Sequence, residues 1–321
     1  MRPKIALIGT GNISEFHAPA IKAAGFDIIG CCGSPNSERA KKFSISHSIK
    51  RVYNNYNEVI DDSSNWDCLL IATSVETTYS ILKKSLITKK PIMVEKPVST
   101  KPEELLNLGN DLNKVMVAYN RRFYSTIQYA KIFLEKYHPC QIKLELPDSI
   151  DFNIDKQNQE YFSVRENSVH GFDLLFYLLP DLQLKIVDEY KQPNNAYGKY
   201  AILESPRGDS VFIYLNWNSP SNFSLNLESY PHRLELKPFE TFSLYKGMQV
   251  IEPSEDYPLR KYVPKLIKSG NVFEKNKQFK PGFYEQSLEF LNIVKGQKPL
   301  ISANINDAYR AAYLADLIIK K

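Results

Sequence analysis

Residues 4–14, Lys-Ile-Ala-Leu-Ile-Gly-Thr-Gly-Asn-Ile-Ser, decide the fold of this chain. The apolar run up to Ile8 is typical of a buried strand, and a helical pattern follows the two glycines. Gly9 allows a tight turn, and Gly11 lets the backbone approach a pyrophosphate whose charge meets the helix N-terminus. Ser14 takes the third position of the motif, where Gly or Ala is usual. The residues expected to contact a dinucleotide here are Gly9, Gly11, Asn12 and Ile13.

Strand and helix patterns alternate over the first 120 residues. Helical patterns separate further strands, which are expected at residues 26–32, 67–73, 92–94 and 115–119. A helix is expected from Thr100 to Asn113, with Pro102 in its first turn. Repeated strand–helix units predict a parallel sheet with right-handed crossovers.

The pattern changes after about residue 121. Short alternating strands dominate residues 185–251, at 197–204, 209–217, 223–230, 233–236 and 241–245, and two helices close the chain. Such strands predict an antiparallel sheet with one face free. The predicted class is α/β: a Rossmann, doubly wound parallel sheet in residues 1–120, and an α/β domain with an open, mostly antiparallel sheet in residues 121–321. The closing helices could pack back on the first domain.

Composition narrows the class of protein. The net charge is +5 and the basic residues are scattered, which argues against a clustered nucleic-acid footprint. Cys31 and Cys32 are adjacent and the other two cysteines are isolated, so reduced thiols and a cytoplasmic location are expected. We see neither a signal-peptide pattern nor an apolar run near the roughly 18 residues of a membrane span. The histidines show no metal-ligand spacing.

Lys96 is the leading candidate for chemistry. It lies in Glu95-Lys96-Pro97, directly after the apolar residues 92–94, and ligands on parallel sheets bind at the carboxyl ends of the strands. A lysine beside a nicotinamide can polarise a carbonyl or stabilise an alkoxide. The alternative is a solvated loop lysine. Thr73 and Glu95 are assigned to the same cofactor site.

The end of the second strand bears on the choice of cofactor. Ser34 stands where an acid would bind the ribose 2′-hydroxyl of NAD, so the repulsion that excludes a 2′-phosphate is missing. Ser34 could bind that phosphate, with Arg39 as its charge partner. NADP(H) is therefore favoured and NAD(H) remains possible. The alternative is that Ser34 only caps a helix and Arg39 is solvated.

Several segments in sequence order resemble the glucose–fructose oxidoreductase/inositol dehydrogenase (Gfo/Idh/MocA) family over nearly the whole chain. They are Gly9-x-Gly11, Ala72-Thr73, Glu95-Lys96-Pro97, residues 120–123 (Asn-Arg-Arg-Phe), and residues 166–173, which are similar to the Asp-x-Gly-x-His-x-x-Asp helix of the family. The resemblance implies a Rossmann domain and an α/β domain whose open sheet forms dimers or tetramers. It also implies oxidation or reduction of sugars, cyclitols and their derivatives with NAD(P).

Site residues follow from the resemblance. His170 matches the catalytic histidine that exchanges a proton with the substrate hydroxyl, and imidazole suits this near neutral pH. Glu166 replaces the usual Asp, four residues before His170, so either the pocket has adapted or Glu166 lies outside it. Thr78 replaces a histidine that is usual in the family. The residues assigned to the substrate are Lys96, Arg122, Tyr161, Asp173 and Trp217. Asp173 could instead be structural, and Trp217 could be a core residue rather than a stacking platform.

The predicted function is hydride transfer between a nicotinamide and a carbinol or carbonyl carbon of a sugar, cyclitol or sugar derivative. Two alternatives stay open: reduction of a non-sugar substrate such as an imine or a bilin, and a non-catalytic NAD(P)-binding sensor. A homodimer or homotetramer through the C-terminal sheet is expected, with neither nucleic acid nor a membrane as a partner.

Overall fold

The computed structural model describes residues 1–99, 101–109, 112–149, 167–191, 197–274 and 277–320. Contacts divide the chain into two units. The first unit comprises Met1–Phe123 and Asn276–Asp316, and the second comprises Tyr124–Lys275 and Leu317–Lys321. No helix within the described ranges is long and apolar enough to cross a membrane.

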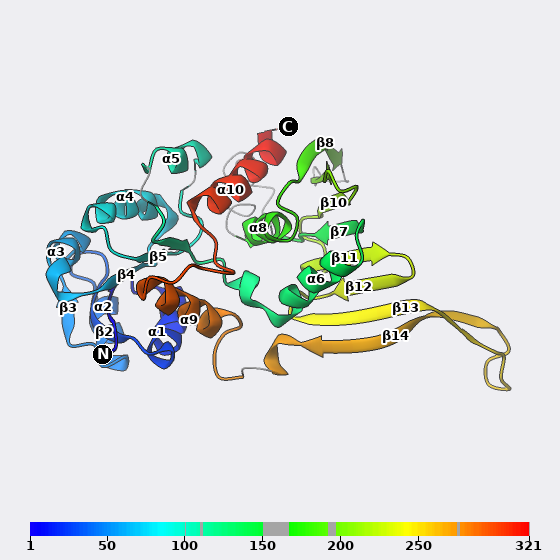
Figure 1. Ribbon diagram of the computed structural model, residues 1–321, viewed down its shortest axis with the longest axis horizontal. Coiled ribbons are helices and arrows are strands. Elements are labelled where there is room, and N and C mark those ends of the chain that lie inside the picture. The colour runs from blue at the N-terminus through cyan, green and yellow to red at the C-terminus, as the bar shows by residue number, and fades with distance from the viewer. Residues whose placement is uncertain (100, 110–111, 150–166, 192–196, 275–276, 321) are drawn as a thin grey trace. The chain divides into compact units, whose positions relative to one another are not determined.

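The first unit is built on a parallel sheet of six strands (Figure 1). Its strands are β1 (Lys4–Ile8), β2 (Asp27–Cys32), β3 (Arg51–Tyr53), β4 (Cys68–Ile71), β5 (Ile92–Val94) and β6 (Val115–Val117). The order is β3-β2-β1-β4-β5-β6, that of a Rossmann fold. Strands β1 to β3 are added toward one edge of the sheet and β4 to β6 toward the other, so the strand order reverses between the neighbours β1 and β4.

The helices of the first unit are α1 (Asn12–Ala24), α2 (Glu38–Ser46), α3 (Tyr56–Asp61), α4 (Val75–Ser85), α5 (Pro102–Leu106), α9 (Phe283–Val294) and most of α10 (Ile305–Lys320). Helices α1 to α4 contact strands of the sheet. The residues of β1 from Ile5 onward are buried, because helices sandwich a parallel sheet on both faces. Residues from the C-terminal part of the chain also belong to this core. Phe290 of α9 stacks on Phe26 with ring centroids 5.8 Å apart.

The second unit contains a sheet of eight strands. They are β7 (Gln141–Glu145), β8 (Gln183–Lys191), β9 (Tyr197–Glu204), β10 (Ser210–Leu215), β11 (Ser224–Ser229), β12 (His232–Leu236), β13 (Thr241–Ile251) and β14 (Lys261–Asn271). The order is β14-β13-β12-β11-β7-β10-β9-β8, and β7 and β10 pair in parallel while the other neighbours are antiparallel. Helices α6 (Ser125–Lys136) and α8 (Val169–Leu178) lie on one face (Figure 1). The α/β class with these two sheets is confirmed.

Three local expectations need correction. The helix expected to reach Asn113 ends at Leu106: the N–H of Asn107 bonds to Glu104, and Gly109 has φ +95°. The strand expected to end at Tyr245 runs to Ile251 and pairs with β14, which the sequence patterns did not predict. The alternation of apolar and polar residues that marks a half-buried strand is weak in the outer part of β13 and in β14, because most side chains of both strands are exposed.

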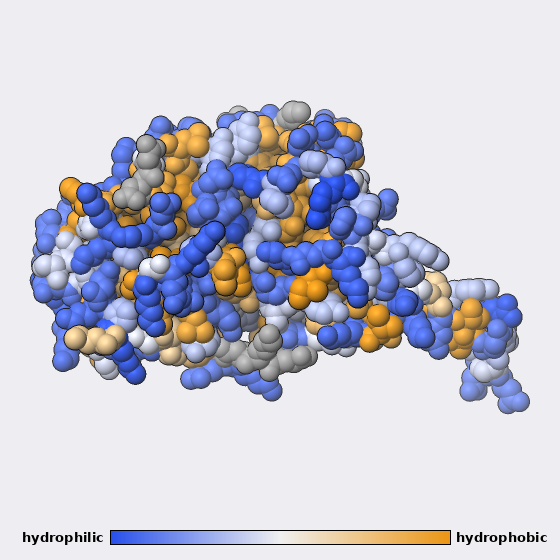
Figure 2. Space-filling view, in the orientation of Figure 1, coloured by the Kyte–Doolittle hydropathy of each residue, from blue (hydrophilic) through white to orange (hydrophobic). Residues whose placement is uncertain are grey.

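Strands β13 and β14 continue beyond the rest of the sheet. β13 pairs with β12 only from Ser243 to Lys246, whereas from Met248 to Ile251 it pairs with β14 alone. We call residues 247–264 the hairpin arm. Hydrophobic surface is visible along this hairpin (Figure 2). Its exposed apolar side chains include Met248, Val250, Tyr257, Leu259 and Tyr262.

Candidate dinucleotide site

A cavity of about 470 Å³ lies within the first unit, where β1, β2 and β4 end. Its walls come from the segments directly after these strands: residues 9–11, 33–35 and 72–74. The ends of β1 and β4 flank the point at which the strand order reverses, and ligands of open α/β sheets bind in that crevice. Five residues expected at the cofactor line the cavity: Gly9, Gly11, Ser34, Arg39 and Thr73.

The two glycines of the turn serve different purposes. Gly9 has φ +103°, and a Cβ atom on it would stand 2.0 Å from the carbonyl oxygen of Ala72. Its N–H donates to the carbonyl oxygen of Cys32 at 2.8 Å, which ties the turn to the end of β2. A Cβ atom on Gly11 would meet nothing within 4 Å. Gly9 therefore fits the turn against β4, and Gly11 leaves the backbone open toward the cavity.

Ser14, the departure from the usual motif, has a specific place in the turn. Its side chain is fully buried, and its hydroxyl donates to the carbonyl oxygen of Gly9 at 2.9 Å. Its N–H bonds to the carbonyl oxygen of Gly11 at 3.0 Å. The serine thus closes the loop from inside and satisfies a buried carbonyl group.

The segment after β2 forms the opposite wall. Ser34 and Arg39 are exposed and line the cavity. The neighbouring Glu38 pairs with Lys41 at 2.7 Å rather than with Arg39. Among the residues that the structure describes, none forms an ion pair or hydrogen bond with the Arg39 guanidinium. This wall therefore presents a hydroxyl and a positive charge.

The sequence patterns did not anticipate that the start of α3 would line the cavity. Asn55 and Tyr56 reach the cavity from the start of α3. Asn55 caps this helix, and its side chain accepts hydrogen bonds from the N–H groups of Asn57 and Glu58. An Asn before a short helical pattern is a recognisable cap, so the helix could have been predicted. Its approach to the end of β2 depends on the pairing of β2 with β3.

A hydroxyl pair shapes the wall after β4. Thr73 and Thr78 approach to 2.9 Å through their Oγ1 atoms. Thr78 is buried, and its hydroxyl also lies within bonding distance of the carbonyl oxygens of Thr73 and Ser74. Thr78, which replaces the usual histidine, therefore holds the turn that carries Thr73.

The remaining cofactor candidates lie outside the lining of this cavity: Asn12, Ile13, Glu95 and Lys96. Glu95 is buried and bonds to His17, with Oε1 2.6 Å from Nε2. Lys96 is half-buried and lies two residues beyond the end of β5. Arg122, assigned to the substrate, is buried with Nη1 3.4 Å from the carboxylate of Asp307.

The second unit carries the other candidates. His170 and Asp173 are both buried on α8, one helical turn apart. Trp217 is also buried, after β10. Glu166 and Tyr161 lie outside the described residues.

Thiol chemistry finds no support in the environment of the cysteines. All four are buried and free. Burial raises the pKa of Cys31 to about 11. Burial, and then the charge of the neighbouring Cys31, raise the pKa of Cys32 to about 12. Burial also raises the pKa of Cys140 to about 11. Because a thiolate is the reactive form, these thiols are poor nucleophiles at neutral pH. The described part of the chain holds no cluster of three His, Cys, Asp or Glu side chains that could bind a metal ion.

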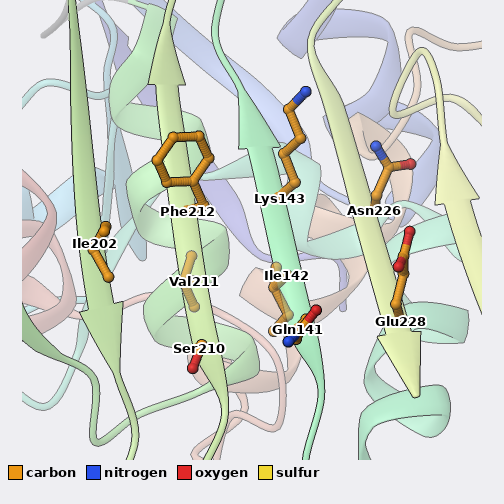
Figure 3. A pocket seen from close by; sticks show the side chains of 9 residues that line it. All are labelled: Gln141, Ile142, Lys143, Ile202, Ser210, Val211, Phe212, Asn226 and Glu228. Carbon is orange, nitrogen blue, oxygen red and sulfur yellow. The ribbon is translucent and has the colours of Figure 1, made fainter. Parts of the chain in front are cut away.

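The sheet of the second unit carries a depression of about 350 Å³ on four neighbouring strands (Figure 3). Gln141 and Lys143 on β7, Phe212 on β10 and Asn226 on β11 are exposed or half-buried there. Between them Ile142 and the other alternate residues are buried on the face that α6 and α8 occupy. The outer sheet face, defined by Gln141, Lys143, Phe212, Asn226 and Glu228, is mixed in polarity.

Comparisons with known proteins bear on the first unit most directly. The model of a family described as "Oxidoreductase family, NAD-binding Rossmann fold" (GFO_IDH_MocA) matches residues 3–120. The predicted family resemblance and the enzyme class are thereby confirmed. No curated protein matches the chain.

Solved structures share the fold over the whole chain. A dehydrogenase (MviM) from Clostridium difficile is 19% identical with a TM-score of 0.75, covering 100% of this chain and 99% of that one. Levoglucosan dehydrogenase in complex with NADH and L-sorbose is 15% identical with a TM-score of 0.77, covering 100% and 96%. Lactobacillus casei myo-inositol dehydrogenase with NAD(H) and myo-inositol is 16% identical with a TM-score of 0.72, covering 98% and 93%.

Proposed function

We propose that the protein is an NADP(H)-dependent dehydrogenase of a sugar, a cyclitol or a sugar derivative, on the premise that residues 3–120 match the model of the NAD-binding Rossmann fold of the Gfo/Idh/MocA oxidoreductase family. The observation that carries the proposal is the cavity at the ends of β1, β2 and β4, with Gly9 and Gly11 in its wall. The sugar and cyclitol bound by two structures of the same fold support the substrate class.

The wall after β2 supports NADP(H) over NAD(H). An acid at this place would bind the ribose 2′-hydroxyl and repel a 2′-phosphate. Here Ser34 offers a hydroxyl and Arg39 a guanidinium that no described carboxylate neutralises. Arginine binds phosphate through parallel N–H donors, so this pair suits the additional phosphate.

The proposed chemistry divides between two side chains. Bound NADP(H) would supply the hydride acceptor or donor at nicotinamide C4. Lys96 would polarise the reacting oxygen, because an ammonium group stabilises the negative charge that develops there. His170 would take the proton of the substrate hydroxyl during oxidation and return it during reduction. Glu166 would assist or orient His170. The proposed substrate contacts are Lys96, Arg122, Tyr161, Asp173 and Trp217.

We also propose that two copies of the chain associate through the outer sheet face. In the described part of the second unit, α6 and α8 lie on the opposite face (Figure 1), so this face is left without a helix. The hairpin arm supports the proposal, because an isolated pair of strands is marginally stable in water. Apolar side chains of the arm, such as Met248 and Tyr262, would be covered by the second copy.

Titration of the protein with NADPH and NADH side by side, followed by fluorescence, tests the cofactor assignment. Stronger binding of NADPH is expected. Preference for NADH would contradict the roles of Ser34 and Arg39 and leave the dehydrogenase assignment standing. Binding of neither would contradict both.

A panel of sugars, polyols and cyclitols with NADP⁺ tests the substrate class. Turnover that Lys96→Ala abolishes without weakening NADPH binding would support the role of Lys96. Turnover restricted to imines or other non-sugar carbonyl analogues would overturn the sugar assignment. Tight cofactor binding without turnover of either class would favour the sensor.

A further inference from the structure

A buried hydrogen bond between a histidine and a carboxylate links the first helix to the residue before Lys96. His17 on α1 is fully buried, and Glu95 is 7% exposed. Nε2 of His17 lies 2.6 Å from Oε1 of Glu95. A carboxylate withdrawn from water is costly unless it is paired and hydrogen-bonded, so this geometry ties α1 firmly to the end of β5.

The second oxygen of Glu95 connects the pair to Lys96. Oε2 accepts a hydrogen bond from the backbone N–H of Lys96 at 3.2 Å. The N–H of Glu95 donates to the carbonyl oxygen of Ile71 on β4 at 2.8 Å. One carboxylate therefore restrains the direction in which the chain leaves β5, and His17 holds that carboxylate.

Lys280, on another segment of the chain, interacts electrostatically with the same carboxylate. Burial lowers the pKa of Lys280, the charge of Glu95 opposes this shift, and Arg121 lowers the pKa further. Nζ of Lys280 lies 4.5 Å from the ring centroid of Phe16 and 5.3 Å from that of Phe283. Glu95 and Lys280 therefore lie within electrostatic range of each other, and Arg121, also in the first unit, acts on Lys280.

Packing fixes the imidazole. The ring of His17 lies 4.7 Å from that of Phe283, tilted by 53°. Its Nδ1 atom has no hydrogen-bond partner in the described chain. The contact with Glu95 is therefore the polar interaction that orients the ring, with an N–H on Nε2 that donates to the carboxylate.

We propose that His17 is a positioning residue for Lys96 and acts through Glu95. The proposal rests on the role assigned to Lys96 under the proposed function. His17 and Glu95 are not part of the cavity wall that contains Gly9, Ser34 and Arg39. Loss of His17 should therefore displace Lys96 and slow the chemical step while leaving cofactor affinity nearly unchanged.

The matched control is His47. Its Nε2 also pairs with a carboxylate, that of Glu15 on α1, at 2.7 Å, but the side chain of Glu15 is 51% exposed. His47→Gln should leave turnover and cofactor affinity at wild-type values. His17→Gln keeps an amide N–H at about the distance of Nε2, whereas His17→Asn and His17→Ala do not reach Glu95.

The experiment combines kinetics with a direct probe of Lys96. The full-length variants are compared in kcat, KM and the dissociation constant for NADPH. Lysines are also dimethylated with ¹³C-formaldehyde, and the NMR signal of Lys96 is assigned by its loss in Lys96→Arg. His17→Ala is expected to lower kcat by about 10–100-fold, with the dissociation constant within about threefold of wild type, and to move the Lys96 signal. His17→Gln should restore much of both.

An unmoved Lys96 signal in His17→Ala would overturn the proposal, whatever the activity. So would a kcat that falls equally in His17→Ala and His17→Gln, because the amide donor would then not replace the imidazole. If wild-type protein turns over no sugar or cyclitol, the proposed function fails and the Lys96 signal alone decides the positioning role. Should His17→Ala not fold, His17→Asn takes its place with the same expected losses.

Discussion

Gly9 lies so close to Ala72 that a Cβ atom on Gly9 would stand 2.0 Å from the carbonyl oxygen of Ala72. The contact joins the turn after β1 to the end of β4, the two segments that flank the cavity. Backbone approach of this kind leaves no space for a side chain at Gly9.

Gly9→Ala and Gly11→Ala should therefore fail in different ways. Gly9→Ala combines this clash with φ +103°, so the first unit should lose more than about 1 kcal/mol of stability. Gly11→Ala has free space, so stability should hold while the methyl group weakens NADPH binding about tenfold or more. Thermal unfolding and fluorescence titration of both variants check this pair. Equal stability of the two proteins would contradict the structural reading of Gly9.

Ser14→Ala should destabilise the first unit without touching the cavity. The change removes a buried hydrogen bond to Gly9 and leaves its carbonyl oxygen without that donor. A loss of about 1–3 kcal/mol is expected in the free energy of unfolding. Urea unfolding measures it, and Ser80→Ala on the exposed face of α4 serves as the control because its hydroxyl bond is at the surface. A wild-type midpoint for Ser14→Ala would show that the hydroxyl contributes little.

Two substitutions should both move the cofactor preference from NADPH toward NADH. Arg39→Ala should weaken NADPH about 10–100-fold and leave NADH nearly unchanged, because only NADPH carries the 2′-phosphate. Ser34→Asp should additionally strengthen NADH, since its carboxylate can bind the ribose hydroxyls. Dissociation constants for both cofactors decide the matter. Parallel loss of NADPH and NADH in Arg39→Ala would place Arg39 outside the phosphate site.

The pH dependence of stability should reflect Asp62. Oδ2 of Asp62 accepts hydrogen bonds from Tyr53 and Arg51, each at 2.6 Å. The Tyr53 hydroxyl, then Asn65, then the charge of Arg51 lower the pKa of Asp62 below its ordinary value. Because the folded pKa is depressed, the carboxylate stabilises the fold above its unfolded pKa of about 4, and this stabilisation is lost as the pH falls toward the folded pKa.

Asp62→Asn keeps an oxygen acceptor for Tyr53 and removes the titration. The stability gap between wild type and Asp62→Asn should therefore shrink from pH 6 to about pH 3 in urea unfolding. Asp61→Asn, at an exposed neighbouring position, is the control. If the difference in stability between wild type and Asp62→Asn stays constant over this range, the titration of Asp62 is not the cause of the pH dependence.

Self-association should depend on the hairpin arm. Replacing Met248, Val250 and Tyr262 together by serine removes exposed apolar surface that would be buried between copies. The dissociation constant of the oligomer should rise at least tenfold, as measured by light scattering across a concentration series. Leu300→Ser, at another exposed apolar residue, should leave the state unchanged. A monomeric wild-type protein would refute the proposed association at once.

Local patterns were sufficient for much of the first sheet. β1 and β5 are apolar runs that end at clear turn residues, so their predicted bounds match Lys4–Ile8 and Ile92–Val94. β3 and α3 are only three and six residues long, too short for a periodic signal. β14 escaped prediction because its exposed side chains do not alternate between apolar and polar.

The candidate site could be predicted where function rests on the backbone turn. Gly9 and Gly11 stand directly after a strand, so their place in the cavity wall followed from spacing. Asn55 and Tyr56 line the cavity because β3, which precedes them, pairs with β2. No local pattern near Gly9 predicts that pairing. The contact of His17 with Glu95 could not be predicted either, because the two residues are 78 positions apart in sequence and no local pattern links them.

The first unit is interrupted in sequence, and this matters for how the protein is made. Phe290 and Ile293 of α9 complete a core that begins with Ile5 and Leu7. A ribosome therefore releases all of Tyr124–Lys275 before it supplies the helix that finishes the nucleotide-binding unit. We expect the sheet of the second unit, whose strands β7 to β14 all lie in Tyr124–Lys275, to become protease-resistant first on stalled nascent chains. Resistance of the first unit in chains that stop before α9 would disprove this order. The N-terminal part of the first unit is synthesised early. Part of its apolar core would remain exposed to solvent until α9 has been translated.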